Sequence, residues 1–244
     1  MRNIRLDICY DGTRYQGWQR LPGQQTIQGK IETALSRILD EPVEISGSGR
    51  TDAGVHAKGQ VANFHCTNPM PCGQILAELR RYLPEDIGIW SCKEASDRFH
   101  ARLNAKEKTY EYRLWYASSP CVFERRYVAQ IDTGHLDLER MQTAAELLAG
   151  THDFSAFCGN RQFKKSTVRT IHQIRIFRQG EELRFRFTGN GFLHHMVRIL
   201  VGTLIEVGMG SRSVESIPDL FGGKREDAGF LAPGKGLCLE EVIY

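Results

Sequence analysis

The sequence lacks the features of a membrane or secreted protein. It has no apolar run near the roughly 20 residues that a membrane-spanning helix takes. Its seven cysteines are scattered, and none forms a C-x-x-C pair, which favours reduced thiols in the cytoplasm. Residues 1–7 carry charges where a signal peptide would be apolar, so we expect no export.

The sequence also has little that indicates a nucleotide, a metal or a protease site. It contains no G-x-G-x-x-G, and no G-K-[ST] follows a glycine-rich loop. His194 and His195 are adjacent, so on the helix predicted there they cannot form the i, i+4 pair of a zinc helix. Asp132-Thr-Gly134 matches the D-T-G of aspartic proteases, but only one copy is present and a helix is predicted directly after it. We therefore expect no metal site.

One stretch concentrates glycine around a single carboxylate. Residues 47–57 carry Asp52 between Arg50 and small residues, with glycines at 47, 49 and 54. Glycine lets the backbone turn sharply and lets another surface approach closely. Asp52 is therefore either a turn former that bonds its own backbone or a chemical group presented to a ligand.

Positive charge is modest in total but unevenly distributed. The net charge is only +3, whereas residues 159–178 carry six basic residues and no acidic one. These are Arg161, Lys164, Lys165, Arg169, Arg175 and Arg178. Residues 98–113 form a second basic segment, and aromatic residues interrupt both segments. Such runs are either solvated faces or a groove for a phosphate backbone with rings that stack on bases.

Hydrophobic periodicity predicts the same order of elements twice. The first half predicts strands at 3–10, 43–46, 60–66 and 87–92, with helices at 26–39 and 72–83. The second half predicts strands at 109–116, 170–178, 182–187 and 237–243, with helices at 136–148 and 192–207. Each half reads β-α-β-β-α-β, the ferredoxin-like unit. We expect an α+β protein with two ferredoxin-like lobes, 1–105 and 106–244. We expect the lobes to share one mostly antiparallel sheet, with helices on one side and a central catalytic cleft.

A reactive carboxylate needs a cation nearby to stay ionised in a partly buried place. Arg50 is two residues from Asp52, and Arg198 lies in an otherwise apolar predicted helix. Arg198 either extends to water from the edge of that helix or pairs with a carboxylate. Tyr110 is either an ordinary aromatic residue of the sheet or a ring that stacks on an extruded base.

Five stretches resemble, in order, the motifs of the TruA family of tRNA pseudouridine synthases, and together they span nearly the whole chain. They are Tyr10–Arg20, Gly49-Arg-Thr-Asp-Ala-Gly-Val-His-Ala57, Phe99-His-Ala-Arg102, Lys108-Thr-Tyr110, and Asn190–Arg198 followed by Gly202.

The resemblance implies two ferredoxin-like lobes, a homodimer, no cofactor, and conversion of uridine to pseudouridine at positions 38, 39 and 40 in the anticodon arm of tRNA. It implies that Asp52 is catalytic, with Arg198 as its ion-pair partner, and that Arg50 helps to push out the target base. Tyr110 corresponds to the tyrosine that stacks on that base. His56, Arg102 and Lys108 lie in the same motifs and are expected to bind substrate.

Ser48 stands where the family often has Ala, and Gly191 where it often has Ser or Ala. We expect neither position to carry chemistry, although they leave open a paralogue with other target positions. Two alternatives come from other functional classes: a catalytically silent RNA-binding module of the same fold, and a scaffold for protein interactions. No RNP1-like stretch supports the former.

Overall fold

The computed structural model describes residues 1–160 and 165–244, in which the chain forms two compact units. Unit 1 comprises Met1–Lys106 together with Cys238–Tyr244, and unit 2 comprises Glu107–Leu237. Arg161 and Lys164, predicted members of a basic segment, lie outside the described residues.

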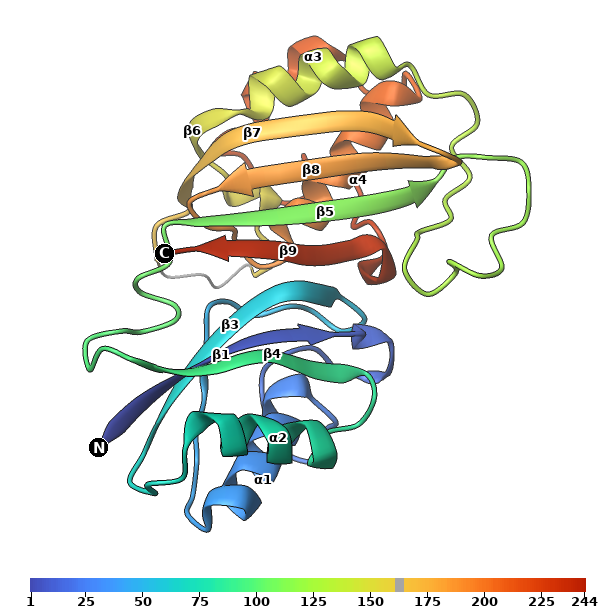
Figure 1. Ribbon diagram of the computed structural model, residues 1–244. Coiled ribbons are helices and arrows are strands. Elements are labelled where there is room, and N and C mark those ends of the chain that lie inside the picture. Colours follow the sequence, from blue (N-terminus) through green and yellow to red (C-terminus); the bar gives the residue numbers. More distant parts are fainter. Residues whose placement is uncertain (161–164) are drawn as a thin grey trace. The chain divides into compact units, whose positions relative to one another are not determined.

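Unit 1 contains strands in the order β4-β1-β3-β9, and the short β2 pairs with β3 (Figure 1). β1 runs antiparallel to β3 and β4, whereas β9 runs parallel to β3. Helices α1 and α2 lie on one face of these strands. The elements are β1 (Arg2–Tyr10), α1 (Ile27–Leu39), β2 (Ser46–Gly47), β3 (His56–Cys66), α2 (Cys72–Tyr82), β4 (Ile87–Ala95) and most of β9 (Leu237–Ile243).

Unit 2 contains strands in the order β5-β8-β7-β6, with antiparallel neighbours throughout. Helices α3 and α4 pack together and against this sheet (Figure 1). The elements are β5 (Glu107–Trp115), α3 (Leu138–Leu148), β6 (Gly150–Asp153), β7 (Val168–Gln179), β8 (Glu182–Gly189) and α4 (Met196–Gly208).

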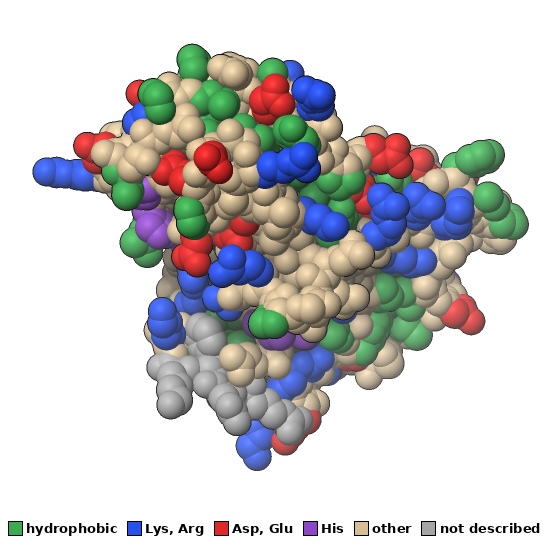
Figure 2. Space-filling model, turned by 90° about the horizontal axis from the view of Figure 1, so that it is seen from below, with side chains coloured by type: hydrophobic (Ala, Val, Ile, Leu, Met, Phe, Trp, Pro, Cys, Tyr) green, Lys and Arg blue, Asp and Glu red, His purple; other side chains and the backbone are tan. Residues whose placement is uncertain are grey.

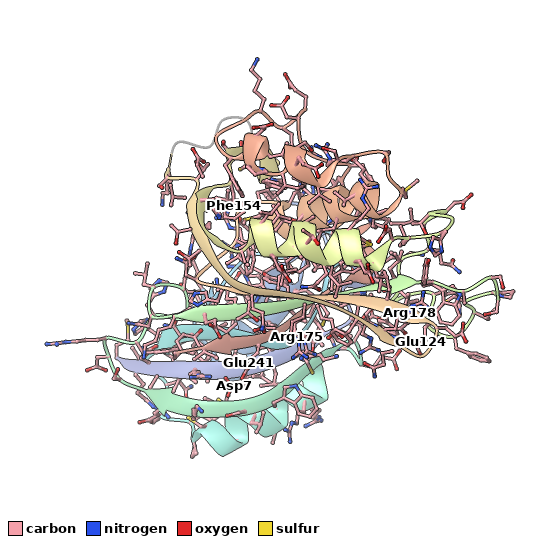
Figure 3. All side chains as sticks on the ribbon, turned by 90° about the horizontal axis from the view of Figure 1, so that it is seen from above. Asp7, Glu124, Phe154, Arg175, Arg178 and Glu241 are labelled. Carbon is pink, nitrogen blue, oxygen red and sulfur yellow. The ribbon has the colours of Figure 1, made fainter. Side chains whose placement is uncertain are left out.

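Each unit has a core built from alternating strand residues. In β1 the fully buried side chains are Ile4, Leu6 and Ile8, and in β8 they are Leu183, Phe185 and Phe187. Phe154, which follows β6, is also fully buried (Figure 3). A strand with one buried face places every second side chain in the core. The predicted mixed α+β class with a largely antiparallel sheet is confirmed.

Helix α1 begins and ends where local signals place it. Thr26 caps α1 by accepting the amide of Gly29 through Oγ1. The helix ends at Asp40, whose left-handed backbone (φ 52°) cannot continue it. Gly180 (φ 58°) makes the predicted turn between β7 and β8.

The strand predicted at residues 43–46 forms only at its end. Ser46 and Gly47 pair with β3, but the preceding amides bond to side chains of α1. Ser36 Oγ accepts the amide of Val43, and Glu32 Oε1 accepts that of Ile45. Because side chains satisfy these donors, the segment does not need a neighbouring strand.

The last strand belongs to the first unit and not to the second lobe predicted at 106–244. In β9, Cys238 and Leu239 pair with His56 and Ala57. The carbonyl of Ile243 also accepts the amide of Lys106. The chain therefore returns to the unit in which it began. None of the helices in the described part of the chain has the length and apolar character that a membrane span needs.

Candidate active site

Asp52 lies in a turn between β2 and β3. It is half-buried, and its carbonyl accepts the amide of Val55 at 3.2 Å. Gly54 has a φ of 74°, which lets the chain reverse there. Arg50 is exposed at the start of the turn, whereas Thr51 is only 7% exposed. The predicted glycine-rich turn is therefore present, and strand β3 begins within its last residues.

The segment after β1 holds this turn by its backbone. The amide of Trp18 donates to the carbonyl of Thr51 at 3.0 Å, and the amide of Gly54 donates to the carbonyl of Tyr15 at 3.3 Å. One bond lies on each side of Asp52. Residues 10–20 and 49–57, which the sequence presents as separate motifs, thus form one substructure within unit 1.

Two glycines let the segment approach the turn this closely. An added Cβ at Gly12 would lie 2.0 Å from the carbonyl oxygen of Val55. At Gly17 (φ 91°) it would lie 2.6 Å from the carbonyl oxygen of Thr51. Any side chain at either position would displace the turn that carries Asp52.

His56 contacts the same segment. Its Nδ1 lies 3.1 Å from the amide nitrogen of Gly12 and 3.2 Å from Oδ1 of Asp11. An unprotonated Nδ1 accepts the amide proton, and a protonated one donates to the carboxylate. His56 is only 6% exposed, so these contacts help to fix the end of the turn in either protonation state.

The segment that carries Arg102 is fixed to the sheet of unit 1. The side chain of Asn3 donates to the carbonyl of Phe99 at 2.8 Å, and that of Asn63 accepts the amide of Ala101 at 2.8 Å. The hydroxyl of Tyr244 donates to the carbonyl of Ala101 at 2.7 Å. Arg102 itself is exposed. A cation is thus presented to solvent from an anchored backbone.

Unit 2 carries the other predicted site residues. Arg198 is half-buried on α4 among buried Val197 and Ile199, and its Nε donates to the carbonyl of Ala232 at 2.7 Å. This bond satisfies one donor of the half-buried guanidinium. The pairing of Arg198 with Asp52 stays a prediction.

Tyr110 lies on β5 and is only 7% exposed. Its ring meets that of Phe192 edge to face, with centroids 5.3 Å apart. The contact fixes the plane of the Tyr110 ring. Lys108, two residues earlier, is half-buried opposite Gly189 of β8.

The helix predicted at 192–207 begins four residues later than expected. His195 has a left-handed φ of 65°, so α4 starts only at Met196. His194 and His195 therefore precede the helix, and their rings stack with centroids 3.6 Å apart. The prediction that they lie on a helix and point apart is wrong.

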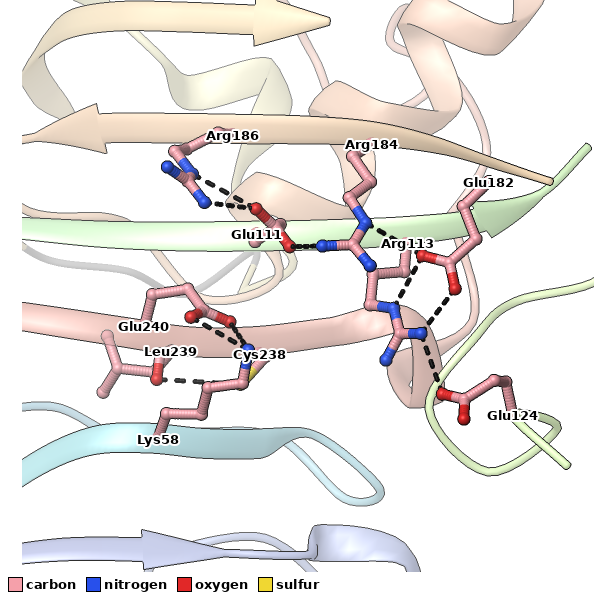
Figure 4. A network of polar contacts seen from close by, with 10 residues as sticks. All are labelled: Lys58, Glu111, Arg113, Glu124, Glu182, Arg184, Arg186, Cys238, Leu239 and Glu240. Carbon is pink, nitrogen blue, oxygen red and sulfur yellow. Dashed lines mark hydrogen bonds and ion pairs between the residues drawn. The ribbon is translucent and has the colours of Figure 1, made fainter. Parts of the chain in front are cut away.

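Several arginines of unit 2, Arg113 of the basic segment among them, already bond to carboxylates and are not available to a phosphate. Arg113 bonds to Glu182 and Glu124, while Arg184 and Arg186 bond to Glu111 (Figure 4). The hydrogen bonds that Arg113 donates to Glu182 and Glu124 raise the pKa of Arg113, although burial lowers it. In contrast, Arg175 and Arg178 are exposed on β7 (Figure 3). On the face in Figure 2, basic and acidic side chains are interspersed.

The polar residues buried against the turn of Asp52 were not predicted from the sequence. Gln60 is fully buried on β3 and Tyr10 is 5% exposed at the end of β1. The sequence did contain one signal for Gln60. It lies two and four residues before Ala62 and Phe64, so it shares a face of the strand with these buried apolar residues, and a buried polar side chain needs hydrogen-bond partners.

Comparison with known proteins identifies the family. A model of the tRNA pseudouridine synthase family matches residues 8–104 and 144–244. The chain is 46% identical to a tRNA pseudouridine synthase A from a Bacillus species and 44% identical to tRNA pseudouridine synthase A 2 of Bacillus cereus. It is 43% identical to the tRNA pseudouridine synthase A of Acetivibrio thermocellus. Each comparison covers 100% of both proteins. The resemblance seen in the motifs is confirmed, and the chain belongs to the tRNA pseudouridine synthases, isomerases that convert uridine to pseudouridine in tRNA.

Proposed function

We propose that this enzyme modifies uridines 38, 39 and 40 in the anticodon arm of tRNA. The family membership and the full-length similarity to enzymes named tRNA pseudouridine synthase A support this assignment. The structural observation that carries it is the turn of Asp52, held on both sides by residues 10–20. A tRNA substrate and free cysteines agree with a cytoplasmic location.

The reaction needs few chemical groups. The N1–C1′ bond breaks, the base turns, and C5 bonds to C1′, while C5 loses its proton and N1 carries one. Substrate and product have the same atoms and the same oxidation state. One carboxylate, which attacks C1′ or removes a proton from the ribose, and a surface that retains the detached base are sufficient.

We assign Asp52 as that carboxylate and Arg198 as its ion-pair partner. A guanidinium beside a partly buried carboxylate keeps it ionised. The half-buried positions of both side chains favour such a pair over two solvated charges. Arg198→Lys keeps the charge, whereas Arg198→Met removes it. We expect Arg198→Met to lose more activity than Arg198→Lys at neutral pH.

Arg50 and Tyr110 are proposed to act on the target base. Extruding a base costs a few kcal/mol, which stacking and phosphate contacts offset. Arg50 is exposed and lies two residues before Asp52. The ring of Tyr110 is held by its edge-to-face contact with Phe192. His56, Arg102 and Lys108 are proposed to bind the surrounding substrate; for His56, the contacts with Asp11 and Gly12 show a structural part as well.

We also propose a homodimer, as the family resemblance implies. Light scattering on the purified protein should give twice the 27.7 kDa chain mass. A mass that stays at one chain across micromolar concentrations would contradict the dimer.

The decisive experiment for the reaction is position mapping. The protein is incubated with unmodified tRNA and no added cofactor, and pseudouridine is located nucleotide by nucleotide. We expect product at 38, 39 and 40. Product elsewhere in the tRNA would identify a paralogue with other targets, and binding without product would favour the silent RNA-binding module. Binding should also weaken steeply with salt, because phosphate contacts release counterions.

A further inference from the structure

A buried polar network lies beneath the turn of Asp52 in unit 1. Its side chains come from the end of β1, the turn and β3, and are at most 7% exposed: Tyr10, Ser48, Thr51 and Gln60. Burying polar groups is costly unless their hydrogen bonds are made. The hydrogen-bond partners of these four side chains therefore show which part of the backbone the network holds in place.

Gln60 is the centre of the network. Its Oε1 accepts the hydroxyl of Ser48 at 2.6 Å and the amide of Val61 at 3.1 Å. Its Nε2 donates to the carbonyl of Gly49 at 3.1 Å, and its side chain also lies near enough to the hydroxyl of Tyr10 to lower the pKa of that group. A glutamine amide has two donor hydrogens and two acceptor positions, so these bonds use both acceptor positions and one donor hydrogen.

Tyr10 extends the network to the residue before the catalytic aspartate. Its hydroxyl lies 2.8 Å from Oγ1 of Thr51. Burial raises the pKa of Tyr10, while the bonds to Thr51 and Gln60 lower it by less. The hydroxyl therefore stays protonated at neutral pH and can either donate to the hydroxyl of Thr51 or accept from it.

These bonds fix the turn at several successive points. Ser48, Gly49 and Thr51 are held from below by side chains. The backbone bond from Trp18 holds the carbonyl of Thr51. The backbone that carries Asp52 is therefore held in position and direction by side chains of β1 and β3. A satisfied buried network favours one arrangement over its alternatives.

We propose that Tyr10, Gln60 and Ser48 are positioning residues that hold the carboxylate of Asp52 in its reactive place. The proposal rests on the proposed catalytic role of Asp52. The proposal gives Ser48 a part that the sequence did not suggest. Removing the hydroxyl of Ser48 should lower activity less than removing that of Tyr10, because Oε1 of Gln60 would still accept the amide of Val61.

The sharpest test is the pair Thr51→Val and Thr51→Ser. Valine has nearly the shape of threonine without the hydroxyl, and serine keeps the hydroxyl. We expect Thr51→Val and Tyr10→Phe each to lower kcat about tenfold, because small displacements of a reacting group are costly. The KM for tRNA should stay within twofold, and Thr51→Ser should retain most of the kcat. The double variant should lose little more than either single one, because both remove the same bond.

Ser36→Ala is the control for stability. Its hydroxyl accepts the amide of Val43, outside the turn and its network. We expect it to lower the melting temperature without changing kcat. If Thr51→Val is folded and keeps the wild-type kcat, or if Thr51→Ser is as impaired as Thr51→Val, the network is only structural and the proposal is wrong. If Asp52→Asn itself keeps full activity, the proposed function fails first.

Discussion

Replacing Gly12 with alanine tests how tightly the reaction depends on the position of the turn. The new Cβ would lie 2.0 Å from the carbonyl oxygen of Val55 and 2.7 Å from its carbonyl carbon, whereas real Cβ contacts are essentially never shorter than 3.0 Å. The segment of residues 10–20 and the turn of Asp52 must therefore separate by about 1 Å. Because the amide of Val55 bonds to the carbonyl of Asp52, the shift is transmitted to the aspartate.

A displacement of about 1 Å at a reacting group costs on the order of 10²-fold in rate. We expect Gly12→Ala to lose about that much in single-turnover rate, with tRNA binding nearly unchanged. The assay can follow tritium released from C5 of labelled uridine, since the new carbon–carbon bond displaces that hydrogen.

Gly73→Ala is the matched control. Gly73 lies in α2, and an added Cβ there meets nothing within 4 Å. Alanine in a helix stabilises by about 0.5–1 kcal/mol relative to glycine, so this variant should be fully active and slightly more stable. A folded Gly12→Ala enzyme with the wild-type rate would refute the argument that the close approach positions Asp52.

Three further predictions concern other parts of the two units. Tyr244→Phe removes the hydrogen bond to the carbonyl of Ala101, the residue before Arg102. It should raise the KM for tRNA about threefold to tenfold without changing kcat, since one hydrogen bond contributes about 1 kcal/mol. An unchanged KM in steady-state kinetics would show that Arg102 needs no such anchor. Glu111→Gln removes the carboxylate that pairs with Arg186 and one of the two that pair with Arg184, and should cost about 1.5–3 kcal/mol in urea unfolding. Glu94→Gln at an exposed pair should change little; equal losses would contradict the role of burial. For Glu182, burial raises the pKa, but the bonds and charges of Arg113 and Arg184 outweigh it and lower the pKa below 4.5. Its stabilisation is therefore present above pH 4.5 and lost as the pH falls through the lowered value, so the gap in urea midpoint between wild type and Glu182→Gln should narrow from pH 7 to pH 3, and a constant gap would exclude this linkage.

Local signals in the sequence were sufficient for most helices. The spacing of apolar residues and the cap at Thr26 predicted α1 to within a residue. They failed at α4, because the left-handed backbone at His195 follows from tertiary packing and has no signature in a run of apolar residues.

Long-range pairing was the harder part. Nothing in residues 237–243 tells which strand they join, and their parallel pairing with β3 is determined by the whole fold. The segment at 43–46 has strand-like residues, but Glu32 and Ser36 take its amide hydrogens. Side chains on a preceding helix are not part of any periodicity argument.

The sequence motifs suggest which residues of the candidate site act chemically, and that assignment stays a prediction. They do not indicate which residues hold Asp52 in place. The glycine-rich motif identified Asp52, and the family comparison agrees with the motifs. The substructure that holds it joins residues far apart in sequence, such as Tyr10 with Thr51 and Ser48 with Gln60. The pair of Tyr10 and Thr51 forms only when β1 lies beside β3, and the pair of Ser48 and Gln60 only when β2 and the turn pair back along β3.

The most direct measurement compares two aspartate variants on unmodified tRNA. Asp52→Asn keeps the shape of the side chain and removes its negative charge, while Asp40→Asn does the same at the exposed end of α1, where asparagine tolerates the left-handed backbone. Asp40→Asn should form pseudouridine at the wild-type rate, and Asp52→Asn should still bind tRNA but form none. Pseudouridine made by Asp52→Asn at the wild-type rate would contradict the assignment of this carboxylate as the catalytic group.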